Sequence, residues 1–512
     1  MNRMLIGLML VITLLTGLTI QTAAAPAGKE YNLSANIPLN SYIYPFLDKL
    51  DGLGLLQPMQ NGTKPYTRMQ VAQWIQQLRT TVAQKPLPDY VEQLLNQLET
   101  EFRDELAILD GAPNINRIKV TDFAWTNSYY DGQTLTQHQT LSTYQPLNGN
   151  NNGYRWDEGG NTALSVGVTA NLGESLVFNA VPRLGPDHDG DFAAGLDTGY
   201  LKTHLGNFQI QLGKAAMWWG PSERASLILS NNSEPFTTLK LSNLEPVEFK
   251  WLPFLGPSNA TFFYSELGDD RTDVPNPSYI GIRTDFTPTA NFTFALSFNS
   301  FLGGEGHEVS WDDLWDFLTQ KNAMTATTDK WNTISGIDYR WRIPKLNGLQ
   351  LYGAYYGEDA KDSPPLPYKP GWLWGLYYPK LTPDGSWDLR LEKSLTDQVW
   401  YRHMLYTDGY VHGNDIIGDP MGNNAFRNYV KLSHYLADGS QLAFHGEYTV
   451  MDRAAAYPQK LSSFWVTYQT QLPDPSWRLT TTLGFAKVDQ LNYQSGRTGE
   501  NYLGSIELQH QF

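Results

Sequence analysis

The chain closes with Tyr502-Leu503-Gly504-Ser505-Ile506-Glu507-Leu508-Gln509-His510-Gln511-Phe512. Apolar and polar residues alternate along this stretch. Tyr502, Ile506, Leu508 and Phe512 fall on one face, and Ser505, Glu507 and Gln509 fall on the other. Because successive side chains of a β-strand point to opposite sides, the alternation predicts a strand with one apolar and one polar face.

The same period of two continues through most of the chain from about Asn116 onward. Apolar faces are formed by Leu164, Val166 and Val168, by Phe208, Ile210 and Leu212, and by Phe292, Phe294, Leu296 and Phe298. Their opposite faces carry Gln, Ser, Thr and small residues. This pattern is typical of a transmembrane barrel, whose outer face contacts lipid and whose lumen is wet, although a large soluble β-protein shares it.

Composition and loop lengths favour the barrel. Aromatic residues make up 13% of the chain, while its mean hydropathy is only −0.40, and polar lumens with aromatic girdles produce this combination. Beyond the N-terminus, no apolar run reaches the roughly 18 residues of a membrane-spanning helix. We therefore predict a mainly β fold: a transmembrane antiparallel outer-membrane β-barrel of about 18 strands over residues 117–512.

The terminal strand also predicts how such a barrel reaches its membrane. A final Phe after an alternating strand resembles the signal by which bacterial barrels are recognised for insertion. We therefore expect Tyr502, Ile506, Leu508 and Phe512 to act as a barrel-insertion signal, with the barrel-insertion machinery and outer-membrane lipids as partners. The last strand of an ordinary soluble sheet is the alternative for this segment.

The N-terminus has the pattern of a secretory signal peptide. Asn2 and Arg3 precede an apolar run from Met4 to Ile20, and small residues follow it. This arrangement predicts a signal peptide over residues 1–25 and export of the chain. An N-terminal membrane anchor is the alternative.

Between the signal peptide and the barrel, the spacing of apolar residues is helical. Val91, Leu94, Leu95 and Leu98 share one helical face, and the pattern continues to Leu109. We predict a small helical domain of about three helices over residues 26–116, with apolar faces wide enough to pack on one another.

Charge and cysteine content exclude several classes of function. The chain contains no cysteine, which excludes disulfides, Cys-ligated metals and a thiol nucleophile. Its net charge is −15 and it has no cluster of Lys and Arg, so no nucleic-acid partner is expected.

Three segments carry a resemblance to a known family. They are Gly213-Lys214-Ala215-Ala216-Met217-Trp218-Trp219-Gly220-Pro221 with Ser226 to Asn232, Ser41 to Leu50 with Lys64 to Arg68, and Tyr401-Arg402-His403 with Gly409-Tyr410. Together they resemble the capsule-assembly Wzi family. The likeness in layout covers essentially all of the predicted mature chain.

The resemblance implies both a location and a role. It implies an outer-membrane β-barrel of about 18 strands with a periplasmic helical bundle. It also implies a lectin that binds capsular polysaccharide and anchors it at the cell surface during capsule assembly, without catalysis and without a cofactor. The partners expected on this basis are capsular polysaccharide, outer-membrane lipids, the barrel-insertion machinery and the capsule-export machinery.

The residues that could hold a glycan are two aromatic and two amide side chains. Trp218 and Trp219 could stack on sugar rings, while Asn231 and Asn232 could bind hydroxyl groups. The structural alternative is favoured, because paired Trp residues near a strand end also serve in barrel packing and Asn pairs also form turns.

Two other functions remain open as alternatives. A passive porin for solutes is the first, and an outer-membrane hydrolase acting on glycan or lipid is the second. Asp187-His188-Asp189-Gly190-Asp191 lacks the spacing of a calcium loop, and the adjacent acids Asp269-Asp270 and Asp312-Asp313 suit loop charge better than glycosidase chemistry. We therefore predict no catalytic residue and no metal site.

Overall fold

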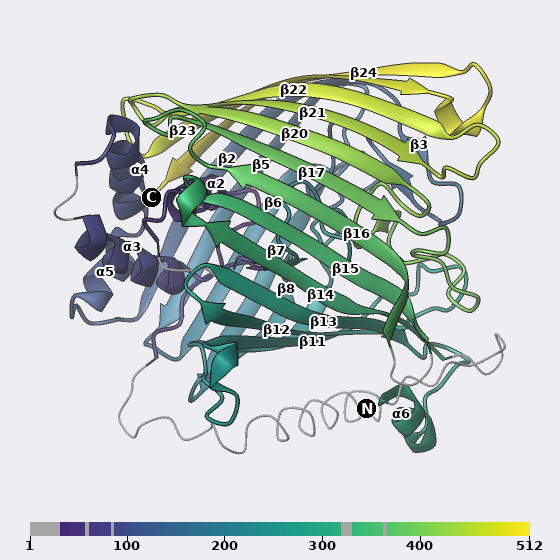
Figure 1. The fold of residues 1–512 in the computed structure, drawn as a ribbon, viewed down its shortest axis with the longest axis horizontal. Coiled ribbons are helices and arrows are strands. Elements are labelled where there is room, and N and C mark those ends of the chain that lie inside the picture. The colour runs from purple at the N-terminus through teal and green to yellow at the C-terminus, as the bar shows by residue number, and fades with distance from the viewer. Residues whose placement is uncertain (1–30, 57–60, 83–85, 319–329, 362–365) are drawn as a thin grey trace.

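The computed structural model describes residues 31–56, 61–82, 86–318, 330–361 and 366–512, so the predicted signal peptide lies outside the described residues. Eighteen antiparallel strands close into one barrel (Figure 1), which confirms the predicted fold. These strands are β2 (Arg117–Asp131), β5 (Gly159–Leu172), β6 (Leu176–Pro186), β7 (Phe192–Leu205), β8 (Phe208–Lys214), β10 (Thr237–Asn243), β11 (Ser258–Glu266), β12 (Ser278–Thr289), β13 (Phe292–Leu302), β14 (Trp331–Ile343), β15 (Leu349–Lys361), β16 (Leu366–Tyr378), β17 (Trp387–Thr396), β20 (Phe426–Tyr435), β21 (Gln441–Met451), β22 (Gln459–Gln471), β23 (Trp477–Asp489) and β24 (Thr498–Gln511).

The burial of side chains on these strands is inverted relative to a soluble protein. On β8, the apolar Leu212 is 54% exposed, whereas the neighbouring Gln211 is 1% exposed. Leu296 and Ser297 on β13 show the same contrast. Because polar side chains face a filled lumen and apolar side chains face outward, the outer surface matches a hydrocarbon surrounding.

The strand predicted from the C-terminal alternation closes the barrel. β24 pairs with β2, with Leu508 opposite Trp125, and β2 pairs in turn with β5. Tyr502, Ile506 and Phe512 are exposed on the outer face, as the alternation predicted. Closure leaves neither terminal strand with an unpaired edge.

The two ends of the barrel differ in the length of their connections. At the end near the helices the strands are joined mostly by short turns, such as 173–175, 206–207 and 290–291. At the other end lie long connections, including 132–158, 215–236 and 397–425. This asymmetry is the usual arrangement of outer-membrane barrels.

Four helices lie at the short-turn end: α2 (Ile43–Gly52), α3 (Arg68–Val82), α4 (Asp89–Glu101) and α5 (Arg103–Leu109). Their apolar faces form one core with Tyr435 of the barrel wall. The helix predicted to run through to Leu109 is broken at Phe102, because the Arg68 side chain hydrogen-bonds the Glu101 carbonyl and also pairs with Glu101 and Glu105. In the part of the chain that the structure describes, no helix has the length and apolar character needed to cross a membrane.

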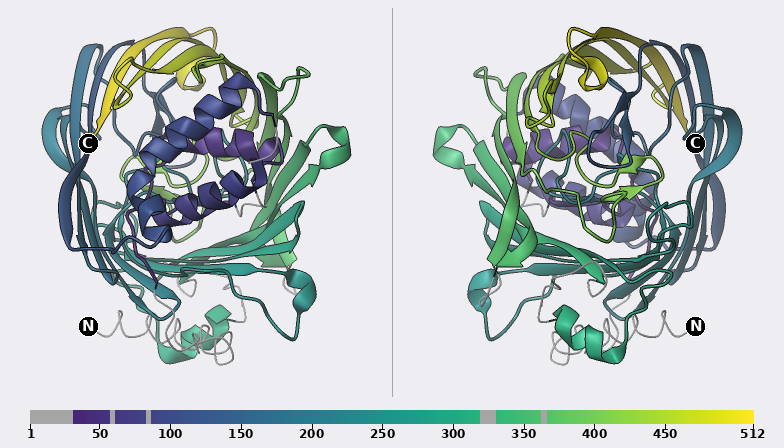
Figure 2. Two further views of the ribbon diagram at one scale, coloured as in Figure 1. Left: turned by 90° about the vertical axis from the view of Figure 1, so that its left-hand side faces the viewer. Right: turned by 90° about the vertical axis from the view of Figure 1, so that its right-hand side faces the viewer.

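The remaining elements are short. They are β1 (Thr63–Lys64), β3 (Leu135–Thr136), β4 (Thr143–Tyr144), β9 (Trp218–Trp219), β18 (Val411–His412), β19 (Asp415–Ile416), α6 (Trp311–Leu318), η1 (Pro253–Leu255), η2 (Pro344–Leu346) and η3 (Leu491–Tyr493). β1 pairs with β9, so the segment before the helix α3 meets a connection from the opposite end of the barrel. Figure 2 shows the helices lying across one end of the barrel (left) and the long connections lying within the outline of the other end (right).

Candidate functional site

Three connections from the long-loop end, 132–158, 215–236 and 397–425, fold inward and contact one another. The backbone N–H of Asn152 donates to the Asn231 carbonyl at 2.8 Å, and that of Ser230 donates to the Ile417 carbonyl at 3.0 Å. These backbone contacts join all three connections into one body that occupies the loop end of the lumen (Figure 2).

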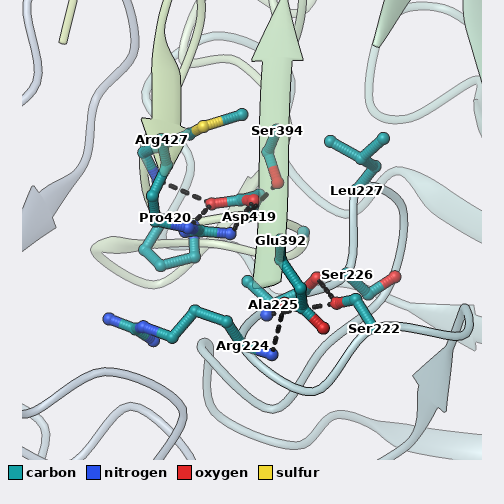
Figure 3. Close-up of polar contacts among 12 residues, drawn as sticks. Ser222, Arg224, Ala225, Ser226, Leu227, Glu392, Ser394, Asp419, Pro420 and Arg427 are labelled. Atoms are coloured by element: carbon teal, nitrogen blue, oxygen red, sulfur yellow. Dashed lines mark hydrogen bonds and ion pairs between the residues drawn. The ribbon is translucent and has the colours of Figure 1, made fainter. Parts of the chain in front are cut away.

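The connection 215–236 is attached to the barrel wall through its tip (Figure 3). Glu392 of β17 accepts hydrogen bonds from the backbone N–H groups of Glu223 and Arg224, at 2.8 and 3.1 Å. Close by, Asp419 of the connection 397–425 pairs with Arg427 of β20 at 2.6 Å. Because these carboxylates are buried and satisfied, they fix the inward-folded connections to the wall.

The same tip is linked to the helical end of the protein. Arg390 of β17 pairs with Glu223 of the tip at 2.7 Å and with Asp48 of α2 at 3.1 Å. Lys431 of β20 also pairs with Glu223, at 2.5 Å. One buried guanidinium therefore joins the N-terminal helices to a connection from the opposite end.

The two tryptophans predicted to stack on a glycan lie inside this body. Trp219 is 1% exposed and packs against Phe263 of β11, with ring centroids 5.3 Å apart. Trp218 is buried as well, and both residues form β9, which pairs with β1. Neither lines the cavity described below. A direct contact of these side chains with a glycan stays a prediction that would require the body to open.

The two predicted asparagines are engaged with backbone carbonyls. Asn231 Nδ2 donates to the carbonyl of Asn150 at 2.7 Å, and Asn232 Nδ2 donates to that of Ile416 at 2.9 Å. Both side chains are buried, so their first role is to join connections to one another. Asn231 differs from Asn232 in that it also lines the cavity.

A cavity of about 430 Å³ runs beside the inward-folded body, along the wall formed by β2, β5, β6, β7 and β24. At the loop end it is lined by Asn150, Asn152, Tyr154, Trp156 and Asn231. The side-chain oxygens Oδ1 of Asn150 and Asn152 are buried and accept no hydrogen bond from the protein. Both residues line the cavity, and a hydroxyl donor that reached these oxygens would satisfy them.

The two aromatic residues at this end of the cavity, Tyr154 and Trp156, differ in the ring and cation contacts that they make. The ring of Tyr154 stacks on His188 at 4.8 Å between centroids, and the guanidinium of Arg183 lies 3.7 Å from its centroid. No ring or cation contact engages the Trp156 indole among the described residues, while Gln145 binds both the N–H and the carbonyl of its backbone. The indole therefore lines the cavity from a fixed backbone.

The sequence pattern did not predict this group of residues as a binding site. The run from Asn148 to Gly153 indicates a turn, and nothing in it distinguishes a turn from a binding loop. The available signal was the combination of several amides with Tyr154 and Trp156 in one short segment, because amides and aromatic rings are the two kinds of group that a sugar site needs.

Ion pairs hold the connections together next to this end of the cavity. Glu234 contacts His188 at 3.3 Å and Lys214 at 2.5 Å, and Arg155 pairs with Asp415 of β19 at 2.5 Å. Burial alone would raise the pKa of Glu234, but His188 and Lys214 lower it to about 2. Burial raises the pKa of Asp415 to about 7, although Arg155 opposes this shift.

Gly153 lies where these ion pairs meet. A Cβ atom at this position would lie 2.7 Å from the backbone nitrogen of Glu234 and 3.2 Å from Asp415 Oδ2. The residue also has a φ of 77°, which favours glycine. Only glycine therefore allows the connection 132–158 to approach its neighbours this closely.

Two of the acidic residues considered for metal or glycosidase chemistry, Asp187 and Asp313, have structural partners. Asp187 Oδ1 accepts backbone hydrogen bonds from Asp189, Gly190 and Asp191, which is a turn. Asp313 pairs with Lys330 at 2.7 Å. Within the described ranges, no group of three or more His, Asp or Glu side chains is arranged to hold a metal ion.

Two of the proteins that this chain resembles are a curated relative and a solved structure. A 55.8 kDa protein of Klebsiella pneumoniae, described as uncharacterised and located in the cps region, is 29% identical over 157 residues. That match covers 30% of this chain and 31% of the relative. The structure of Wzi from Escherichia coli, described as an outer-membrane protein involved in group 1 capsule assembly and a carbohydrate-binding β-barrel, has a TM-score of 0.71 at 18% identity.

The structural likeness extends over 94% of this chain and 100% of the Escherichia coli protein, which shows a common fold. The family described as capsule assembly protein Wzi matches residues 131–503, a range that includes the barrel from the end of β2 to β24 and all three inward-folded connections. The chain therefore belongs to the capsule assembly protein Wzi family.

Proposed function

We propose that this protein binds capsular polysaccharide noncovalently at the loop end of an outer-membrane barrel and holds it at the cell surface during capsule assembly. Membership of the family and the outward-facing apolar surface of the strands support the membrane location. The description of the Escherichia coli protein as a carbohydrate-binding barrel supports the kind of ligand. The role requires binding only, with no bond made or broken.

The observation that carries the proposal is the loop end of the cavity. Two buried, unpaired amide oxygens, those of Asn150 and Asn152, lie on the same connection as the indole of Trp156. Sugars offer hydroxyl donors at their edges and C–H groups on their faces, so this pairing of acceptors with an aromatic ring is complementary to them. A cavity of about 430 Å³ lies within the size range of small-ligand sites.

The packing of the lumen favours capture over passive diffusion. A porin needs an open aqueous channel. Here, the connections 215–236 and 397–425 are fixed to the wall by Glu392 and Arg427, and β1 enters the lumen from the helical end. Single-channel recordings should therefore show no large, steady conductance.

The proposed location assigns a compartment to each part of the chain. Residues 1–25 direct export, residues 26–116 lie in the periplasm, and residues 117–512 span the outer membrane. Outer-membrane lipids, the barrel-insertion machinery and the capsule-export machinery are partners in this scheme. The helices α2 to α5 at the short-turn end support the periplasmic assignment, because short turns face the periplasm in such barrels.

Retention of polymer by cells tests the function. A strain lacking the protein is complemented with the wild type, with Trp156→Ala or with Asn152→Gly, and cell-bound and released polysaccharide are measured. Asn152 has a φ of 62°, so glycine removes the amide without straining the backbone. Trp251→Ala, which changes an exposed tryptophan at the helical end, is the matched control.

We expect the deletion strain to make polymer and shed it into the medium. Trp156→Ala and Asn152→Gly should shed it as well, although their barrels reach the surface in normal amounts, while Trp251→Ala retains it. Unchanged retention in the deletion strain together with reduced uptake of small solutes would overturn the proposal in favour of a porin.

A further inference from the structure

Two lysines and a glutamine form a row across three adjacent strands of the barrel wall. Lys202 of β7 lies opposite Gln211 of β8, and Gln211 lies opposite Lys240 of β10. All three side chains face the lumen and are buried, and Lys240 is 6% exposed. Because directly opposite residues of paired strands have adjacent side chains, the row presents two cations on either side of one amide.

In the part of the chain that the structure describes, neither lysine of this row has an acidic partner. Lys202 Nζ donates to the carbonyl of Ser34 at 2.9 Å and to Asn36 Oδ1 at 2.6 Å, and both acceptors are neutral. Among the described residues, Lys240 makes no hydrogen bond and no ion pair.

Other buried lysines of this protein are paired. Lys49 contacts Asp388 at 3.2 Å, and Lys431 contacts Glu223 at 2.5 Å. The chain carries 52 acidic against 37 basic residues, so carboxylates are plentiful. Their absence from this row is therefore a local feature of the wall rather than a consequence of composition.

An ammonium group with so little exposure and no counter-charge is held at a cost in free energy, and a bound anion offsets much of that cost through short, charge-assisted hydrogen bonds. The row supplies the donors that such an anion needs, because no residue in the described ranges accepts a hydrogen bond from Lys240 Nζ, which carries three N–H groups.

The row adjoins the cavity. Asn36 and Tyr200 both line the cavity. Asn36 also contacts the row, since its Nδ2 donates to Gln211 Oε1 at 3.1 Å and its Oδ1 accepts from Lys202. An anion in the cavity is therefore separated from the row by the side chain of one asparagine.

We propose that Lys202, Gln211 and Lys240 form a binding site for a small oxyanion, a carboxylate or a phosphate, that reaches them from the cavity. The anion is either a free ion or the acid group of a bound sugar, and the two share the same chemistry. The site is distinct from the amide and indole groups at the loop end and does not depend on their role.

Thermal unfolding of the purified protein in detergent tests the site. Thermal unfolding midpoints are measured at constant ionic strength in a buffer whose own anion is bulky and organic. The added ligand is acetate, inorganic phosphate, a hexuronate or the corresponding neutral hexose. We expect a saturable rise with at least one oxyanion and none with the hexose, since a ligand that binds only the folded state stabilises it. A rise with acetate or phosphate identifies a free ion, and a rise with the hexuronate alone identifies an acidic sugar.

Variants of Lys240 locate the effect. Lys240→Met should abolish the rise, and without an oxyanion it should unfold at a higher temperature than the wild type because the unpaired cation is gone. Lys240→Arg keeps the charge and should keep the response, as should Lys345→Met, which changes an exposed lysine of η2. The proposal fails if no oxyanion raises the midpoint of the wild type, or if Lys240→Met responds as the wild type does, which would place the ion elsewhere.

Discussion

Replacing Trp219 by alanine separates an architectural role of this residue from a role in glycan contact. The side chain is 1% exposed, packs on Phe263, and lies so close to Gly281 that a Cβ there would be 2.8 Å from the indole. Removing a fully buried tryptophan costs about 3–5 kcal/mol because a cavity remains. The barrel wall is held by its own hydrogen-bond ladder, so we expect Trp219→Ala to destabilise the inward-folded body and to leave the barrel wall intact.

Hydrogen exchange measures the effect directly. The N–H of Trp219 is bonded to the Leu229 carbonyl at 2.9 Å, and amides of the connection 215–236 exchange only when this body opens. A loss of about 3–5 kcal/mol makes opening more frequent by about two to three and a half powers of ten, since about 1.4 kcal/mol corresponds to a factor of ten. Exchange in strands such as β24 should not change.

Trp219→Phe is the control that makes the prediction refutable. Phenylalanine keeps a ring against Phe263, so exchange in 215–236 should stay near that of the wild type and polysaccharide retention should be kept. If Trp219→Phe lost retention as fully as Trp219→Ala while exchange stayed native, the indole would contact the glycan and our reasoning would be wrong.

Three further changes have defined outcomes. Asp415 holds its proton up to about pH 7 in the folded protein but only up to about pH 3.8 in the unfolded chain. Its contribution to stability therefore declines as the pH rises through this interval. Asp415→Asn should flatten the dependence of the thermal unfolding midpoint on pH. Gly153→Ala places a methyl group 2.7 Å from the Glu234 nitrogen and should release polysaccharide from cells while the surface amount of barrel stays normal. Ile506→Arg on the outer face should lower the free energy of unfolding measured in lipid vesicles by roughly 2–4 kcal/mol if it lies near the midplane, and a charge at the lumenal Gln509 should cost less.

The link through Arg390 connects the two ends of the molecule. Its guanidinium contacts Asp48 of α2 and Glu223 of the connection 215–236, and β1 pairs with β9 beside it. Helix α2 is thus part of the structure that orders the outer connections, because the buried Arg390 guanidinium cannot lose its carboxylate partners without a large cost.

The sequence by itself determined the barrel and the place of the helices. Alternation along Tyr502 to Phe512 depends only on neighbouring residues, since strand geometry sends successive side chains to opposite faces, and the helical period before Asn116 is equally local. The same reasoning predicted one continuous helix where the structure has two, α4 and α5, divided at Phe102. The contact at this break comes from Arg68, which is distant in the chain, so the local pattern did not show it.

The site was decided by the tertiary structure alone. Trp218 and Trp219 are prominent in the sequence, yet their burial depends on β1 and Phe263, which come from other parts of the chain. Asn150, Asn152 and Trp156 look like an ordinary turn until the connections fold inward and form the wall of a cavity. Alternation fixes which way a strand side chain points, but the environment of a loop side chain depends on which distant segments pack against it.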